Sequence, residues 1–538
     1  MKKYLFFFWK IFTGYKFSFT GDNCVADSKD GNTDTRCGSE LHPCKNIAQC
    51  FNRTNSTNNV TVLGTHVLNH TIQITGNTSI IGDSSTIIQG SVDFAFKVIG
   101  GGGYKIHFAL SNVRFIGIGI TSVEEDTDVK IYSCSVLSCS SNTTSAGLIS
   151  ISKSVKQFST IVASSEFHDN TRPLLFHDAI STTKSNRIYI RVENSSIIDS
   201  VSAIVIRGNI RIIMQILETK FINLTEGAIA LTTEEKFGST VDISRSIFMQ
   251  SSSSINFDGV RAINISSSTF YRESSSYHKI SINRAAVSTI QNCLLVQTIK
   301  HRQGRIDNQE RNRLPSKGMV KLVQVKFSLI RNCTFTNSTS SRSGGAVYLR
   351  YVTKSLINGC NFTGNSATLR GGAIYSIGVI TKHINMCNFE RNSATIGGAV
   401  YLRKSSNSLI SNCNFKNNSA VTSKRTNGTG EASGGAIAIS SSSNTSLKNN
   451  NFWYNYAQNK VNPSAARGGA VISLFSEIFS IIECSFERNS ANTGGALHVE
   501  RMGPLHILQS EFTQNTASAY GGKLTGYFIG EIEVGRRK

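Results

Sequence analysis

Apolar and polar residues alternate in short runs along this chain, and the runs end at clusters of Gly, Asn and Ser. In the stretch LINGCNF at 356–362, Leu356, Cys360 and Phe362 share one parity and the residues between them take the other. A period of two is typical of a half-buried strand. A second short strand is expected after each glycine pair, with these inward residues: Val347, Leu349, Ile374, Val400, Leu402, Ile437, Ile439, Leu497 and Val499. The repeat region shows no sustained helical stripe, so the pattern predicts an all-β chain.

The strands recur at a fixed period. Motif phenylalanines follow one another at steps of 27, 27, 26, 37, 34 and 26 residues: Phe335, Phe362, Phe389, Phe415, Phe452, Phe486 and Phe512. The glycine pairs, from Gly344 to Gly521, keep the same spacing, including both long intervals. One repeat is therefore one structural unit, and the long intervals indicate loop insertions.

A unit of this length cannot bury its own apolar face, so it must stack on copies of itself. Stacking in register places like residues in columns: Phe on Phe, and a hydrogen-bonded column of Asn365, Asn392, Asn418, Asn455, Asn489 and Asn515. Five cysteines that precede the phenylalanines by two residues are expected to form an inward column of unpaired small hydrophobes: Cys333, Cys360, Cys387, Cys413 and Cys484. The pattern predicts a parallel β-helix, also called a β-solenoid.

The combination FxxN with GGA[IVL] between 333 and 522 resembles the repeat of the chlamydial polymorphic outer membrane proteins. This resemblance implies a right-handed parallel β-helix of the pectin-lyase-like fold, with the clearest repeats at 333–522. The first repeat departs from the motif at Phe335-Thr336-Asn337, and the last reads Gly521-Gly522-Lys523-Leu524.

The amino-terminal part is similar to the start of other right-handed β-helices. Pro43 to Cys50 is expected to form a short capping helix with Ile47 on its buried side, and three alternating strands follow in 60–90. Cys24, Cys37, Cys44 and Cys50 favour a disulfide-pinned cap, with the connectivity left open. Zinc is not expected, because no CxxC pair occurs and Cys134 with Cys139 has no His cluster.

We predict four segments. Residues 1–20 are either a signal or anchor segment or a misassigned start, 21–58 form the Cys-rich cap, 59–528 form the β-helix, and 529–538 are a tail. A basic, polar insertion at 299–321 interrupts the period and is expected to protrude as a loop. With 5 Pro among 538 residues, no Pro-rich linker divides the chain.

The cysteines of the cap favour an extracellular or cell-surface location, with disulfides. Frequent Asn-x-Ser/Thr acceptors agree with a secreted glycoprotein: Asn52, Asn55, Asn59, Asn69, Asn77, Asn142, Asn194, Asn223, Asn264, Asn332, Asn337, Asn361, Asn417, Asn427 and Asn444. The opening MKKYLFFFWKIF is a poor signal peptide, because Lys10 breaks the apolar run and no small-residue cleavage site follows. No transmembrane segment is expected in this chain, since no run of about 18 apolar residues occurs.

The net charge of +22 raises the question of nucleic acid, which we do not expect as a partner. Basic residues such as Arg350, Lys354 and Lys404 are scattered over turn positions without interleaved aromatics. The insertion is denser, with Lys300, Arg302, Arg305, Arg311, Arg313, Lys317 and Lys321 facing only Asp307 and Glu310. Such a loop is suited to anionic glycans or to anionic cell-surface proteins.

An enzyme is the main alternative, because the pectin-lyase-like fold hosts polysaccharide lyases and glycoside hydrolases. Hydrolysis needs two converging carboxylates, and a lyase needs a base beside a neutralised carboxylate. The NTD, DD and GHG motifs of polygalacturonases are absent, and 333–522 holds no Asp. The best acid–base candidates are His168, Asp169, Arg172, His177 and Asp178, which are also ordinary turn residues.

We therefore predict a non-catalytic extracellular or cell-surface repeat protein that acts as a scaffold, an adhesin-like protein or a glycan-binding module. No catalytic, cofactor or metal residue is assigned, and no cofactor is expected. The alternative is a lyase or hydrolase with a degenerate active site. Tyr348, Tyr375, Tyr401 and His498 are expected to face outwards, where the three tyrosines form either a sugar-stacking ladder or a packing column.

Overall fold

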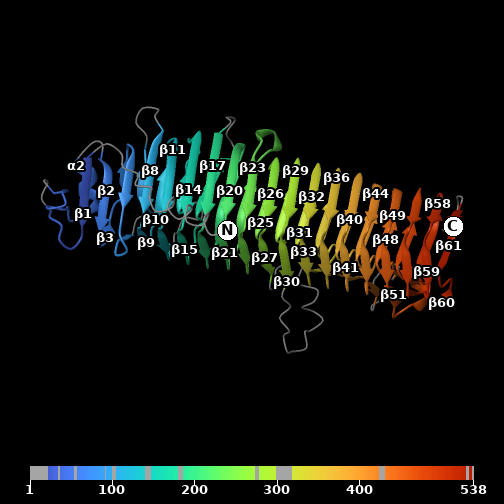
Figure 1. The fold of residues 1–538 in the computed structure, drawn as a ribbon. Coiled ribbons are helices and arrows are strands. Elements are labelled where there is room, and N and C mark those ends of the chain that lie inside the picture. Colours follow the sequence, from blue (N-terminus) through green and yellow to red (C-terminus); the bar gives the residue numbers. More distant parts are fainter. Residues whose placement is uncertain are drawn as a thin grey trace, which may run out of the picture. The chain divides into compact units, whose positions relative to one another are not determined.

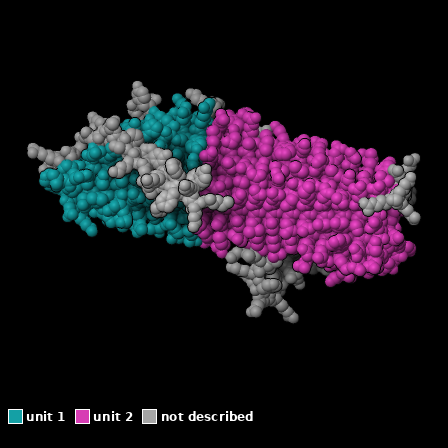
Figure 2. Space-filling view, in the orientation of Figure 1, with its two compact units in different colours: residues 1–201 teal, residues 202–538 magenta. Residues whose placement is uncertain are grey.

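The computed structural model describes residues 22–33, 37–53, 57–90, 93–99, 105–139, 147–179, 186–251, 253–272, 278–297, 318–422, 431–528 and 532–535. The chain divides into two compact units, Met1–Val201 (unit 1) and Ser202–Lys538 (unit 2), which Figure 2 colours teal and magenta. Each unit is built almost entirely of short parallel strands (Figure 1). Successive coils contribute one strand to each of several rows.

The described part of unit 1 has three rows of parallel strands. Row A contains β1 (Asp22–Asp27), β2 (Thr57–Leu63), β5 (Thr78–Ile81), β8 (Ile106–Ser111), β11 (Thr127–Tyr132), β14 (Gln157–Ala163) and β17 (Asn186–Glu193). Row B contains β3 (Thr65–Leu68), β6 (Ile87–Gly90), β9 (Arg114–Ile116), β12 (Ser135–Leu137), β15 (Glu166–His168) and β18 (Ser196–Ile198). Row C contains β4 (Ile72–Ile74), β7 (Phe94–Val98), β10 (Gly119–Val123), β13 (Ile149–Ile151) and β16 (Leu175–Ala179).

Unit 2 has longer rows of the same three kinds. Row A contains β20 (Ile210–Leu217), β23 (Thr240–Ser244), β26 (Ala262–Ser266), β29 (Val287–Gln291), β32 (Phe327–Arg331), β36 (Lys354–Asn358), β40 (Thr381–Asn385), β44 (Ser406–Ser411), β49 (Ser443–Lys448), β54 (Phe479–Ile482), β58 (Leu505–Leu508) and β62 (Ile532–Gly535). Row B contains β21 (Lys220–Ile222), β24 (Ile247–Met249), β27 (Thr269–Arg272), β30 (Leu294–Gln297), β33 (Thr334–Thr336), β37 (Asn361–Thr363), β41 (Asn388–Glu390), β45 (Asn414–Lys416), β50 (Asn451–Trp453), β55 (Ser485–Glu487) and β59 (Glu511–Thr513).

Row C of unit 2 contains β19 (Ser202–Gly208), β22 (Gly227–Thr232), β25 (Ile255–Asp258), β28 (Ile280–Asn283), β31 (Val320–Val323), β35 (Val347–Arg350), β39 (Ile374–Ile377), β43 (Val400–Arg403), β48 (Ile437–Ser440), β53 (Val471–Leu474), β57 (Leu497–Met502) and β61 (Leu524–Phe528). A fourth row, D, contains the short strands β34 (Thr339–Ser340), β38 (Ser366–Ala367), β42 (Ser393–Ala394), β46 (Ser419–Thr422), β47 (Ala432–Ser433), β51 (Tyr456–Asn459), β52 (Ala466–Arg467), β56 (Ser490–Thr493) and β60 (Thr516–Tyr520). The described connections include two 3-10 turns, η1 (Glu235–Phe237) and η3 (Pro463–Ala465). The predicted parallel β-helix is confirmed.

The predicted columns are present in the core of unit 2. Consecutive motif phenylalanines from Phe335 to Phe512 stack with ring centroids 4.6–4.9 Å apart and planes within 8° of parallel. All the predicted inward residues of row C are buried. The five cysteines of the repeat are buried and unpaired, as predicted. Stacking in register therefore makes one continuous apolar interior.

The predicted parity of the strand at 356–362 is wrong in its first half. Ser355 and Ile357 are buried whereas Leu356 is only half-buried, and Cys360 and Phe362 are buried beyond them. The backbone turns at Gly359, whose φ of +62° belongs to the left-handed region. This turn separates row A from row B and shifts the inward parity by one residue, so a single uninterrupted strand was the wrong reading.

The cap contains the short helix α2 (Ile47–Arg53), which begins and ends later than the predicted Pro43–Cys50. Asn46 fixes the start, because its Oδ1 accepts from the N–H of Ala48 while Gln49 Oε1 accepts from the N–H of Asn46, at 3.0 and 2.9 Å. This reciprocal arrangement gives acceptors to two backbone N–H groups at the start of the helix that have no partner within it. Ile47 is fully buried, as predicted.

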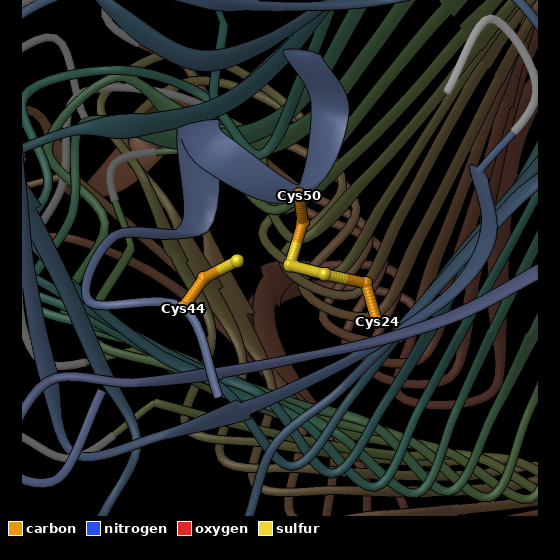
Figure 3. Close-up of side chains that lie close together, drawn as sticks. All are labelled: Cys24, Cys44 and Cys50. Atoms are coloured by element: carbon orange, nitrogen blue, oxygen red, sulfur yellow. A yellow bond between two sulfur atoms is a disulfide. The ribbon is translucent and has the colours of Figure 1, made fainter. Parts of the chain in front are cut away.

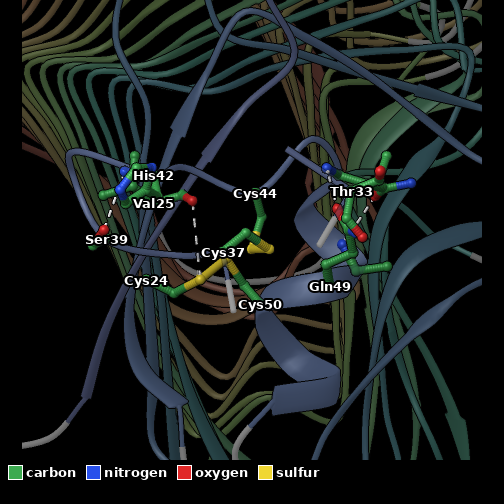
Figure 4. Close-up of a disulfide and its surroundings, with 11 residues drawn as sticks. Cys24, Val25, Thr33, Cys37, Ser39, His42, Cys44, Gln49 and Cys50 are labelled. Atoms are coloured by element: carbon green, nitrogen blue, oxygen red, sulfur yellow. Dashed lines mark hydrogen bonds between the residues drawn. A yellow bond between two sulfur atoms is a disulfide. The ribbon is translucent and has the colours of Figure 1, made fainter. Parts of the chain in front are cut away.

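Two disulfides hold the cap, as the four cysteines suggested. Cys24 of β1 is bonded to Cys50 of α2, and Cys37 is bonded to Cys44. Gln49 also donates a hydrogen bond to the carbonyl of Thr33 at 3.1 Å (Figure 4). The helix α2 is therefore held both to β1 and to the loop that follows β1.

Candidate functional site

The tyrosine column lies on the outer face of row C, but it is covered. Tyr348, Tyr375 and Tyr401 stack at centroid distances of 5.1 and 5.5 Å. Tyr375 and Tyr401 are only 7% and 5% exposed, because they pack with Ala438, Ile472, Ile377, Ile396 and Leu474. Tyr375 and Tyr401 are therefore not exposed for sugar stacking, and of the two alternatives the packing column is the one that the structure shows.

The glycine pairs allow this cover. Gly371 has φ +62°, and a Cβ on it would lie 2.2 Å from the carbonyl oxygen of Ile374. A Cβ on Gly372 would lie 2.1 Å from the carbonyl oxygen of Gly398 in the next coil. Any side chain here would push the turn away from row C, so the repeated Gly-Gly holds the turn against the tyrosines.

The same outer file continues through Ala438, Ile472, His498 and Thr525, which are register partners in successive strands of row C. The tyrosine rings of this file end at Tyr401, and beyond Ile472 the surface opens into a hollow of about 740 Å³. We call it the charged hollow. It is lined by Ser464, Arg467, Thr493, His498, Glu500, Arg501, Thr525 and Gly526.

Charged side chains meet in this hollow. Arg467 Nη1 lies 3.1 Å from Glu500 Oε2, and both side chains are about one-third exposed. Arg501 comes from the end of β57, and its guanidinium stands 5.4 Å from the ring centroid of Phe475. Two guanidinium groups therefore share the hollow with one carboxylate, which leaves it net positive.

His498 is the buried member of the group. Its side chain is 9% exposed, and Nε2 lies 3.8 Å from Glu500 Oε2. Among the described residues, neither ring nitrogen has a hydrogen-bond partner. Burial lowers the pKa of His498, the charge of Arg467 lowers it further, and Glu500 opposes both. The imidazole is therefore neutral at pH 7, with one nitrogen able to accept a proton.

The arrangement is suited to an anionic ligand. Guanidinium groups present planar pairs of N–H donors that match carboxylate or sulfate oxygens. Thr493 and Thr525 add hydroxyl groups at the rim, whereas both ring nitrogens of His498 are buried.

The sequence analysis missed this hollow. Arg467 reaches it from β52, which follows the loop inserted in the 34-residue interval between Phe452 and Phe486. The long interval was the available signal, but it did not show that the loop returns beside row C. His498 faces outwards, as expected, but its side chain is nevertheless buried at the wall of the hollow.

The sequence-based acid–base candidates do not form one site. His168 ends β15 in row B, whereas His177 lies in β16 in row C.

Arg172 is buried and donates to the Asp93 carboxylate at 2.8 Å and to the Asp93 carbonyl at 3.1 Å. His177 is buried with Nδ1 3.0 Å from the carbonyl oxygen of Ile151, and burial lowers its pKa. Asp169 occupies a left-handed turn. These contacts are structural.

One group of potential metal ligands occurs in the described part of the chain, namely Cys24, Cys44 and Cys50 (Figure 3). All three sulfur atoms already belong to disulfides, Cys44 through Cys37. They offer no thiolate to an ion. The basic insertion lies outside the described residues except for 318–321, where Lys321 is part of β31.

The comparisons support the repeat type. Residues 359–377 match the model of the Chlamydia polymorphic membrane protein repeat, which confirms the resemblance drawn from FxxN and GGA[IVL]. No curated protein matches the chain. Among the described residues, no helix has the length and apolarity needed to cross a bilayer.

Several solved structures are similar at low identity. Tailspike protein 3 of bacteriophage CBA120 is 9% identical with a TM-score of 0.25, and the match covers 88% of this chain and 56% of that one. A GH136 lacto-N-biosidase from Eubacterium ramulus is 9% identical with a TM-score of 0.18, over 96% of this chain and 68% of that one. A PL6 family alginate lyase is 9% identical with a TM-score of 0.17, over 90% and 98%. At these TM-scores the likenesses carry no argument about activity.

Proposed function

We propose that this chain is a surface-exposed, non-catalytic β-helical repeat protein that binds anionic glycans in the charged hollow, as an adhesin-like module. The match to the polymorphic membrane protein repeat supports the surface location, and the disulfides of the cap agree with an oxidising compartment. Binding without catalysis is supported by the site, whose charges complement a carboxylate or sulfate.

The observation that carries the proposal is the pairing of Arg467 with Glu500 inside a hollow that also contains Arg501. Arg467 already holds a carboxylate in this geometry, at 3.1 Å. The carboxylate of a uronate would bind to the same kind of donor, with Arg501 as the second cation. Both cations are partly exposed, so we expect the affinity to fall as salt concentration rises.

The test measures the binding of hexagalacturonate by calorimetry at two salt concentrations. Arg467→Met should weaken binding by about tenfold, because one charge-assisted contact is worth about 1.4 kcal/mol or more. Arg391→Met is the matched control, since Arg391 is 70% exposed and does not line the hollow. Equal affinity for the two variants would contradict the proposed site.

A lyase is the second candidate, and His498 is the observation that favours it. A neutral imidazole beside two arginines could remove a proton next to a carboxylate that the arginines neutralise, and this step requires that ligand entry uncovers the buried ring nitrogens of His498. The same hexagalacturonate experiment decides between the two functions. Appearance of an unsaturated uronate by ultraviolet absorbance, lost in His498→Gln, would establish the enzyme. Retention of intact hexagalacturonate supports binding alone.

A further inference from the structure

One coil of unit 2 exposes three aromatic side chains in four residues. Trp453, Tyr454 and Tyr456 are 40%, 46% and 39% exposed. Between them, Asn455 points inwards and joins the asparagine column. The three aromatic rings therefore surround the outer side of the corner between rows B and D.

The neighbouring coils place polar residues at these positions. Trp453 lies between Lys416 and Glu487 in row B, and Tyr456 lies between Ser419 and Ser490 in row D. Tyr454 follows Asn417 and precedes Arg488 in the equivalent turn. The core of the repeat needs none of these rings, because Phe452 and Asn455 already fill the inward positions.

The corner is also held in one arrangement. Tyr454 has φ +53°, a backbone region that aromatic residues seldom adopt. Arg488 donates from Nη1 to Tyr454 Oη at 2.7 Å and from Nε to Gln514 Oε1 at 2.6 Å. Its guanidinium lies 5.6 Å from the Tyr454 ring centroid. The ring of Tyr454 is therefore fixed before any ligand arrives.

Tyr456 borders a second hollow, of about 550 Å³, on this side of the inserted loop. We call it the aromatic hollow. Its polar groups are mostly uncharged, with the amides of Gln458 and Asn492, the hydroxyl of Ser518 and the ammonium of Lys460. Asn492 donates to Ser518 at 2.8 Å, which orients its amide group along the wall. No residue lines both hollows.

We propose that the aromatic hollow binds a neutral hexopyranose unit of an oligosaccharide, with the Tyr456 ring beneath the apolar face of the sugar and the amides on its hydroxyl groups. An exposed aromatic ring offers a flat apolar surface, and side-chain amides offer paired donors and acceptors. Trp453 and Tyr454 extend the contact around the corner to neighbouring sugar units. This inference deepens the proposed glycan binding with a second class of sugar, but it does not depend on the charged hollow.

The test uses three neutral β-linked hexaoses, of glucose, galactose and N-acetylglucosamine, titrated into the Trp9→Phe variant. Trp453 is then the single tryptophan, so its fluorescence reports on this corner. Calorimetry on the unaltered chain gives the affinity. Tyr456→Ala should weaken binding of the bound hexaose by at least about tenfold.

Tyr351→Ala is the matched control, because Tyr351 is 52% exposed and lines neither hollow. Its binding should equal that of the unaltered chain. The inference is overturned if none of the three hexaoses binds, or if Tyr456→Ala and Tyr351→Ala bind equally well. Hexagalacturonate binding in Tyr456→Ala, and hexaose binding in Arg467→Met, show separately whether the first proposal or this one has failed.

Discussion

Lys382 places an amine inside the β-helix at a position that adjacent coils fill with serine. In row A it is the register partner of Ser355 and Ser408, and it is 1% exposed. Among the described residues its Nζ has no hydrogen-bond partner. Burial lowers the pKa of Lys382 to about 7. An unpaired ammonium is costly in such surroundings, so the neutral amine is favoured.

The same coil contains a compensating change in row C. Ser376 occupies the inward position that its register partners Leu349 and Leu402 fill with leucine. A long side chain on row A is thus accompanied by a short one on row C, across the corner at the buried Val379. The total volume of the layer changes little, which a close-packed interior requires.

We predict that Lys382→Met stabilises the protein at about pH 6 and less so at about pH 9.5. The folded pKa lies below the unfolded value of 10.5, so the unfolded chain binds more protons between about pH 7 and 10.5. Stability of the unaltered protein therefore rises with pH across that window. The full difference between the folded and unfolded pKa values corresponds to about 5 kcal/mol of unfolding free energy. The extra stability of Lys382→Met over the unaltered protein should therefore fall by about 3 kcal/mol between about pH 6 and about pH 9.5.

Urea unfolding at both pH values measures this difference. The control is Lys354→Met in the adjacent coil, where the lysine is exposed and the substitution should be neutral at both pH values. An advantage of Lys382→Met that did not change with pH would show that Lys382 gains its charge without penalty.

The sequence was enough to predict which residues stack in columns, but it predicted only in part which side chains point inwards. The spacing of Phe362, Phe389 and Phe415 was enough to place them in one stack. The burial of Lys382 was not foreseen, because inward parity in row A depends on the left-handed turn at Gly359 and its equivalent at Met386. A backbone turn of this kind leaves little trace in a hydrophobic pattern when Met occupies it.

At the scale of elements, the asparagine column joins one coil to the next. Asn392 donates from Nδ2 to the carbonyl of Phe362 at 2.9 Å and to Asn418 Oδ1 at 3.0 Å. Its own Oδ1 accepts from the backbone N–H and the Nδ2 of Asn365, both at 3.0 Å. Every polar atom of the fully buried amide is therefore paired between coils.

Asn392→Ala should destabilise the protein by about 2–4 kcal/mol, because it leaves the buried N–H of Asn365 without an acceptor and removes the side-chain donor to the carbonyl of Phe362. The matched control is Asn388→Ala, four residues earlier on the exposed face of β41, with an expected change within about 0.5 kcal/mol. Urea unfolding measures both. Similar small losses for the two variants would mean that water satisfies the abandoned partners.

This column was predictable because hydrogen bonding between stacked asparagines requires only the repeat period. The start of α2 was not placed correctly, since it depends on the local capping by Asn46 and Gln49 and not on the hydrophobic pattern. The covered tyrosines were misplaced for a related reason. Whether an outward ring is exposed depends on the path of the Gly-Gly turn in the next coil, which no single repeat specifies.

At the scale of the molecule, both hollows lie where the repeat period is broken. The loop in the 34-residue interval separates them, with Ser464 and Arg467 on one side and Gln458 and Lys460 on the other. Regular coils repeat their side chains in columns and leave little room for converging groups. The periodic part of the sequence thus predicts architecture, whereas function is expected at the insertions.

Removal of one whole coil should therefore leave the β-helix intact. Deleting 361–387, a stretch of 27 residues, joins Cys360 to Asn388 and lets β33, β35 and β36 pair with β41, β43 and β44. Phe335 would then stack on Phe389, and Tyr348 on Tyr401, as like on like. Because each coil contacts only its neighbours, the shortened chain loses one interface and keeps the rest.

Deleting 361–373 instead removes 13 residues and joins Cys360 to Ile374, so the coil at the junction lacks its strands in rows B and D and cannot pair in register with the coil before it. We expect the 27-residue deletion to keep the far-ultraviolet circular dichroism of β structure and a single cooperative urea transition, and the 13-residue deletion to weaken that signal and to lose the single transition. If both deletions unfolded alike, contacts beyond adjacent coils would have to hold the fold. The comparison therefore tests whether stacking in register, and not a globular core, is what the repeated sequence encodes.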